Sequence, residues 1–118
     1  MEHITQRPKF FRTDTSLKTV HVEALKWHDK TYGNTYFSAQ ITINNRWVVC
    51  LPFQYGYGSQ FEFEAVHELQ RLGMLSDKHQ GAIKQAMDDI TGSRNNCTIS
   101  CNDALKRDVI AHGEGRYL

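Results

Sequence analysis

Apolar and polar residues alternate most clearly between residues 35 and 55, which predicts two neighbouring strands. In residues 35–44 every second side chain is apolar, as in a strand with one buried face; this face holds Phe37, Ala39, Ile41 and Ile43. The residues between them form a polar face of Tyr36, Ser38, Gln40 and Thr42. Residues 47–55 repeat the alternation with Trp47, Val49, Leu51, Phe53 and Tyr55.

A further strand is predicted at residues 19–27, where Val20, Val22 and Ala24 share one face. The connections carry Gly33-Asn34 and Asn44-Asn45, and glycine and asparagine tolerate the left-handed backbone of tight turns. The three strands therefore form an antiparallel meander. Pro52 has no N–H to donate, so the third strand should be an edge or should carry a bulge near this residue.

Helical spacing follows the meander. Ser59 and Glu62 have the spacing of a capping box, which predicts a helix from about Gln60 to Leu72 with Gly73 as its C-terminal cap. Its apolar face consists of Phe61, Ala65, Leu69 and Leu72, with Val66 at the margin. A second helix is predicted to begin at Ser76, with an apolar stripe of Ala82, Ile83, Ala86, Met87 and Ile90.

The alternation returns at residues 97–101, which predicts a C-terminal strand. For residues 102–112 two predictions stay open: a short helix capped by Asn102 or Asp103, or a longer strand. The order of elements indicates a single α+β domain: a three-stranded antiparallel meander, two helices and a C-terminal strand. We expect this domain to cover residues 19–112, between an N-terminal basic arm (1–18) and a C-terminal tail (113–118) in which Tyr117 and Leu118 can pack on a neighbour.

Charge, hydropathy and cysteine spacing disfavour several classes of function. With 14 basic and 13 acidic residues, the net charge is +1, which disfavours a dedicated non-specific nucleic-acid binder. No apolar run is long enough to span a bilayer, and the N-terminus lacks an apolar signal core. Three cysteines without framework spacing fit a reducing compartment. We therefore expect a cytoplasmic protein without a membrane partner.

The arm at residues 1–18 is locally basic, and two interpretations stay open. Either Phe10 and Phe11 pack the arm onto the body of the domain, or the arm contacts a partner or nucleic acid. Its basic residues are Arg7, Lys9, Arg12 and Lys18.

The corner between the third strand and the first helix is the first candidate site. Gly56, Gly58 and Ser59 lie where a helix begins, and free N–H groups at such a position can bind an anion. No lysine follows at the position that a P-loop requires. The corner therefore serves either as a structural turn or as a contact for an anion or nucleotide.

Aromatic residues are concentrated around this corner, since ten of the thirteen lie between Trp27 and Phe63. Exposed aromatic side chains can anchor a protein interface or stack on bases, whereas buried ones would stabilise the core and the hairpins. The predicted binding surface combines the glycine corner with Tyr32, Tyr36, Tyr55, Tyr57 and Phe63.

The spacing of histidines and cysteines predicts neither a metal nor another cofactor. Cys97 and Cys101 are about 13 Å apart along a strand, too far for both thiolates to bind one zinc ion. The sequence carries no local catalytic motif, so we expect a protein that is not an enzyme. A hydrolase using His67 or His112 ranks last among the alternatives.

The segment from Lys26 to Leu75 resembles a group of small uncharacterised phage and prophage proteins. The resemblance rests on a GN-x-Y-x-S hairpin (Gly33, Asn34, Tyr36, Ser38) and a YGYG-x-Q corner (Tyr55, Gly56, Tyr57, Gly58, Gln60). It implies a phage origin and brings no catalytic residues with it.

The resemblance and the aromatic surplus together predict a small phage-type accessory protein. We expect it to bind and inhibit a host protein, with a defence system as the target in the manner of anti-CRISPR proteins, and to be capable of forming homo-oligomers. The alternative is a nucleic-acid or nucleotide binder that uses the aromatic residues and the glycine corner.

Overall fold

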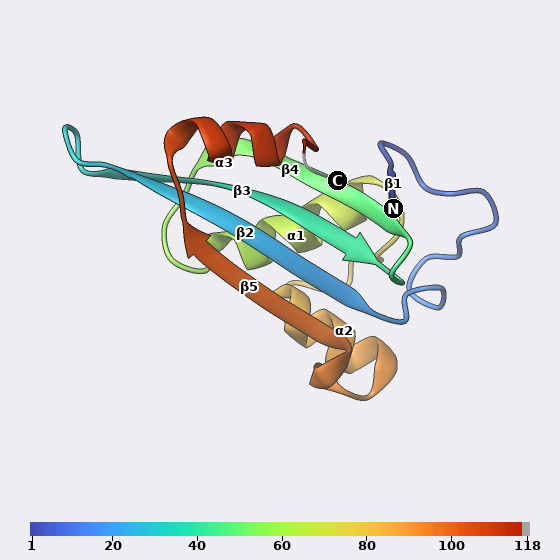
Figure 1. Cartoon of the computed structure of the whole chain (residues 1–118). Coiled ribbons are helices and arrows are strands. Elements are labelled where there is room, and N and C mark those ends of the chain that lie inside the picture. Colours follow the sequence, from blue (N-terminus) through green and yellow to red (C-terminus); the bar gives the residue numbers. More distant parts are fainter. Residues whose placement is uncertain (117–118) are drawn as a thin grey trace.

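A mixed β-sheet lies between helices on both of its faces (Figure 1). The computed structural model describes residues 1–116, and within them five strands form one sheet in the order β1-β4-β3-β2-β5. The strands are β1 (Glu2–His3), β2 (Val20–Asp29), β3 (Asn34–Ile43), β4 (Trp47–Tyr55) and β5 (Cys97–Asp103). The helices are α1 (Gln60–Arg71), α2 (Ile83–Thr91), the 3-10 turn η1 (Arg94–Asn96) and α3 (Lys106–Gly113).

The predicted meander is confirmed. β2, β3 and β4 pair antiparallel, with Ile41 opposite both Val22 and Val49. Asn44 and Asn45 both take positive φ angles in the second turn, as their residue type predicts. The first hairpin extends to the pair Asp29–Asn34 and projects beyond the rest of the sheet (Figure 1).

Two parallel strand pairings complete the single α+β domain. The places of β1 and β5 in the sheet were not predicted. β5 returns through α1 and α2 to lie parallel to β2, while β1 lies parallel to β4. The final helix α3 follows β5 directly, so residues 102–112 contain the end of a strand and then a helix. Neither Asn102 nor Asp103 caps this helix, because its first turn follows Leu105.

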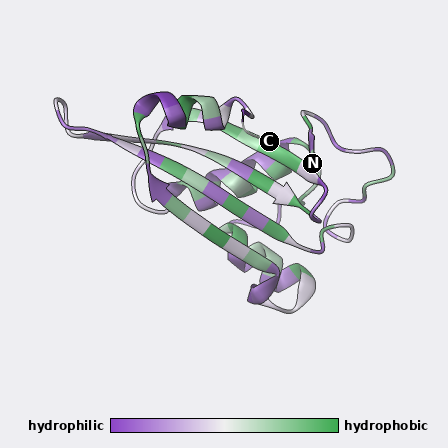
Figure 2. Ribbon diagram, in the orientation of Figure 1, coloured by the Kyte–Doolittle hydropathy of each residue, from purple (hydrophilic) through white to green (hydrophobic). Residues whose placement is uncertain are grey.

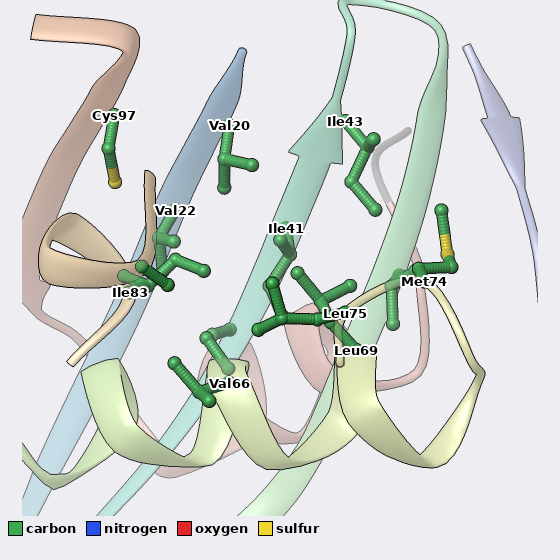
Figure 3. Packing of buried hydrophobic residues seen from close by; sticks show 14 of the residues in the cluster. Val20, Val22, Ile41, Ile43, Val66, Leu69, Met74, Leu75, Ile83 and Cys97 are labelled. Atoms are coloured by element: carbon green, nitrogen blue, oxygen red, sulfur yellow. The ribbon is translucent and has the colours of Figure 1, made fainter. Parts of the chain in front are cut away.

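The core lies between one face of the sheet and the helices α1 and α2. Figure 3 shows Val66 and Leu69 of α1 and Ile83 of α2 against Val22 and Ile41 of the sheet. The polar residues that alternate with these apolar ones along the strands appear as colour bands in Figure 2. Burying an isoleucine or leucine side chain completely contributes about 1.5–3 kcal/mol, so the aliphatic side chains buried on this face contribute strongly to the stability of the fold.

The first 18 residues also contribute to the core, through Ile4, Phe11 and Leu17. Phe11 packs edge-to-face on Trp47, with 5.8 Å between the ring centroids. The expectation that both phenylalanines pack on the body is wrong for Phe10, which is 87% exposed. A hydrogen bond from Phe11 N to Pro8 O closes a turn in which Phe10 takes a φ of 68°, and this backbone turns its side chain outward.

Helix α1 begins at Gln60 as predicted, but the capping box is wrong. Ser59 makes no side-chain capping hydrogen bond, because its ψ of 16° is far from the extended backbone that a capping serine adopts. The predicted Gly73 cap is confirmed: Met74 N donates to Leu69 O and Gly73 N donates to Gln70 O, which is the Schellman pattern.

Helix α2 begins at Ile83, seven residues later than the sequence predicts. Residues 76–82 form an irregular connection whose first residue, Ser76, is held by Asp14 through hydrogen bonds to its backbone N (2.8 Å) and its hydroxyl (2.7 Å). The predicted stripe still packs inward, with Ile83, Ala86 and Met87 buried.

A β-bulge occurs near Pro52, as predicted. Ala39 pairs with Leu51 but Phe37 pairs with Gln54, so β4 has one more residue than β3 in this interval. The extra residue reverses the alternation. Phe53 and Tyr55 therefore lie on the opposite face from Leu51, which corrects the single apolar face expected for residues 47–55.

The polar face of β3 is covered by α3 rather than open to solvent. Ser38 Oγ donates to Val109 O (2.6 Å), and Gln40 Nε2 donates to His112 O (3.1 Å). Gly113 permits this close contact, since a Cβ on this residue would lie 2.9 Å from Leu51 O. Tyr117 and Leu118, expected to pack on a neighbour, lie outside the described residues.

Candidate binding surface

Five aromatic side chains gather on the α3 side of the sheet, at the end where the first hairpin projects. We call this group the aromatic cluster; it consists of Trp27 from β2, Tyr36 from β3, Phe53 and Tyr55 from β4, and Tyr57 from the corner that follows. The pairing of Tyr36 with both Trp27 and Tyr55 fixes the register that brings three strands together here.

The rings of the aromatic cluster contact one another directly. Tyr36 lies parallel to Phe53, with 5.0 Å between centroids and 8° between planes, and Trp27 stacks on Tyr36 at 5.7 Å. Tyr55 meets Tyr36 edge-to-face at 5.8 Å, and Tyr57 meets Tyr55 in the same way at 5.2 Å. Such pairs each contribute about 0.5–1.5 kcal/mol beyond their buried area.

The outer part of the aromatic cluster remains open to solvent. Tyr55 is 52% exposed and Tyr57 is 45% exposed. Leu105 is 57% exposed, and it sits between Ala104, whose N–H donates to Lys26 O, and Lys106, whose ammonium lies 5.2 Å from the Trp27 ring centroid. The outer end of the aromatic cluster is therefore partly exposed, and the Lys106 ammonium lies at its Trp27 ring.

The glycine corner fastens the end of this surface to the first hairpin. Tyr57 donates from its hydroxyl to Gly33 O at 3.1 Å, and Lys26 donates from its ammonium to Gly58 O. Gly56 is buried against Phe37, and Gly58 takes a φ of +55°. The corner thus needs both glycines for different reasons, one for space and one for backbone conformation.

The hydrogen bonds of the corner leave few donors for an anion. Gln60 N already donates to Tyr57 O and Glu62 N donates to Ser59 O, while Glu62 adds a negative charge to the first turn of α1. A hydrogen bond with Tyr57 raises the pKa of the Tyr55 phenol, so the Tyr55 hydroxyl is neutral at physiological pH.

Of the predicted site residues, Tyr36, Tyr55, Gly56, Tyr57, Gly58 and Ser59 lie together. Tyr32 does not join the aromatic cluster, because it sits in the loop of the first hairpin and is 79% exposed. Phe63 lies on α1, which packs on the other face of the sheet. Phe53 belongs to the aromatic cluster but was not predicted as a site residue, although the bulge expected at Pro52 was the signal that its side chain changes face.

A buried polar network, also missed, joins the N-terminal segment to the connection between α1 and α2. His79 Nε2 lies 3.3 Å from the Asp14 carboxylate that accepts from Ser76. Burial raises the pKa of Asp14, but the hydrogen bonds from Ser76 and His79 and the charge of His79 outweigh it, so the net shift is downward. Asp14 lies between the serine and the histidine, so the histidine is not placed to take the serine proton.

The other histidines and the thiols have ordinary structural surroundings. His112 is buried with Nε2 2.8 Å from Glu23 O, and His67 is exposed beside Glu64. Burial raises the pKa of Cys97 to about 11 and also raises those of Cys50 and Cys101, so all three thiols are protonated at neutral pH. Among residues 1–116 no group of three or more His, Cys, Asp or Glu side chains is placed to hold a metal ion.

No helix in the described part of the chain is long and apolar enough to cross a membrane. Comparisons of the chain with protein-family models, with curated proteins and with solved structures found no significant match.

Proposed function

We propose that this is a small phage-type accessory protein that binds a host protein through the aromatic cluster and inhibits it, with a host defence system as the target class. The observation that supports binding is that Tyr55 and Tyr57, which contact each other at the outer end of the aromatic cluster, are about half exposed. Tyrosine and tryptophan are enriched among the residues that dominate interface energies. The resemblance of residues 26–75 to phage proteins supports a host component as the partner.

The ring geometry favours a protein partner over nucleic acid at this surface. Bases stack on ring faces that are open to solvent. In the aromatic cluster the faces of Tyr36 and Phe53 lie against each other, and Trp27 stacks on Tyr36. Tyr55 and Tyr57 meet edge-to-face and are each about half exposed, and a tyrosine offers both an apolar ring and a polar hydroxyl to the mixed surface of a protein.

The test is co-purification of tagged protein from host lysate, followed by calorimetric titration of the partner that mass spectrometry identifies. We expect Tyr55→Ala and Tyr57→Ala each to weaken binding at least tenfold, since anchors of this kind contribute about 2 kcal/mol or more. Phe63→Ala is the matched control, because it also removes an exposed ring but from α1.

Sedimentation of the same variants tests whether the partner is a second copy of the chain. If the wild type self-associates and Tyr57→Ala does not, while the Phe63→Ala control still does, the surface is the interface of a homo-oligomer. Equal weakening by the Phe63→Ala control, or unchanged binding in both tyrosine variants, would refute the aromatic cluster as the interface. Preferential binding of single-stranded DNA by the wild type, lost in Tyr55→Ala, would favour the nucleic-acid alternative.

A further inference from the structure

A second candidate site lies at the far end of β4 from the aromatic cluster. A cavity of about 730 Å³ opens between residues 2–11 and the turn at residues 44–47. We call it the N-terminal cavity, and its lining includes Arg7, Lys9, Arg46, Phe10, Phe11 and Trp47. Trp47 and Tyr55 are the two ends of β4, so about 26 Å of strand separates the cavity from the aromatic cluster.

The lining of the N-terminal cavity is positively charged. Arg7, Lys9 and Arg46 contribute three cations, against a single carboxylate from Glu2. Among residues 1–116, none of these three cations is paired with a carboxylate; the ion pairs present involve other side chains. Arg46 instead lies with its guanidinium 4.7 Å from the Trp47 ring centroid, which holds one cation at the wall of the cavity.

Phe10 combines an unfavourable backbone conformation with an exposed ring. The turn closed by Phe11 N and Pro8 O puts Phe10 at the third position with a φ of 68°, where glycine or asparagine is normally found. A bulky residue with positive φ is an outlier, and such outliers gather at functional sites. The ring is 87% exposed, and the Lys9 ammonium lies 5.2 Å from its centroid.

We propose that the N-terminal cavity binds a nucleotide, with its phosphates held by Arg46, Lys9 and Arg7 and its base stacked on Phe10. The volume is within the range of small-ligand sites, and the cavity combines cations with an exposed ring at adjacent positions. A phosphate attached to a planar base matches this pairing of charge and ring. The same chemistry is offered by a free nucleotide and by the end of a single strand.

Calorimetric titration with three probes tests the proposal: ATP, a ten-nucleotide oligothymidylate with a terminal phosphate, and pyrophosphate. We expect the double variant Lys9→Gln/Arg46→Gln to weaken binding of all three probes at least tenfold, and higher salt to weaken it further. The control Lys84→Gln removes a cation from α2, outside the cavity, and should leave the affinities unchanged. The tighter of ATP and the oligonucleotide identifies the source of the nucleotide.

Phe10→Gly separates recognition of the base from folding. Glycine accepts the positive φ, so this variant should melt at a higher temperature than the wild type. It should also bind ATP and the oligonucleotide at least fivefold more weakly, with pyrophosphate affinity unchanged. The proposal is overturned if no probe binds at millimolar concentration, if the double variant binds normally, if Phe10→Gly affects no probe, or if poly-glutamate binds in preference to nucleotides.

Discussion

Replacing Gly58 with alanine should destabilise the protein through the backbone alone. Gly58 has a φ of +55°, and a Cβ added there would meet no atom within 4 Å. The cost of placing an L-residue in the left-handed region is about 1–2 kcal/mol, with no steric contribution to add. For a domain of this size each kcal/mol corresponds to about 3–6 °C in melting temperature, so we expect a measurable fall.

Gly56→Ala is the matched comparison, because the same substitution two residues earlier acts by a different cause. A Cβ on Gly56 would lie 2.5 Å from Cε1 of Phe37, a ring that is itself fully buried in the core. Overpacking of this kind costs about 1–3 kcal/mol. Gly58→Asn and Gly56→Asn complete the set, since asparagine tolerates positive φ but is larger than alanine.

Thermal and urea unfolding followed by circular dichroism measure all four variants. Gly58→Asn should be more stable than Gly58→Ala, whereas Gly56→Asn should be less stable than Gly56→Ala. The opposite order at either position, or a Gly58→Ala variant that melts with the wild type, would show that the corner does not depend on a left-handed backbone at Gly58 and on free space at Gly56.

Two further stability predictions concern the core and the Asp14 network. Ile41→Ala should cost about 2–5 kcal/mol because the side chain is fully buried, while Thr42→Ala on the other face should cost much less; equal urea midpoints for the two variants would contradict the assignment of faces. The lowered pKa of Asp14 adds stability that is present above its unfolded pKa of about 3.8 and is lost as the pH falls through its folded pKa. Asp14→Asn should therefore make stability fall less steeply as the pH drops below about 4, and an unchanged slope in this range would show that Asp14 does not contribute to the acid sensitivity of the fold.

The meander and the two core-facing helices were predictable because the apolar residues of each element repeat with the period of a strand or of a helix. Ile41 belongs to an apolar pattern that repeats every second residue, and Leu69 belongs to one with helical spacing. Both patterns can be recognised from neighbouring residues alone. The cover provided by α3 was not predictable in this way. Ser38 and Gln40 look like solvent-facing residues, and their partners Val109 and His112 lie about 70 positions later in the chain.

The predicted boundaries failed where a distant side chain competes with a local signal. Ser76 has the residue type of a helix cap, but the carboxylate of Asp14, 62 positions earlier, accepts hydrogen bonds from its hydroxyl and its N–H, and α2 starts only at Ile83. Phe10 shows the converse. Nothing in its local sequence predicts a left-handed backbone, since that conformation depends on how residues 1–11 are anchored by β1 and Phe11.

The bulge in β4 explains why the predicted aromatic surface was partly right. Alternation alone would place Phe53 and Tyr55 in the core with Leu51, where their size would compete with Phe37 and Phe61 for the same space. One extra residue beside Pro52 moves both rings to the opposite face, where they meet Tyr36 just beyond the cover of α3. Deleting Pro52 would make Leu51 and Phe53 neighbours on a regular strand, with Phe53 opposite Ser38 and Tyr55 still opposite Tyr36. Successive residues of a strand face opposite sides, so both rings should stay on the face of Tyr36 and the aromatic cluster should persist without the bulge.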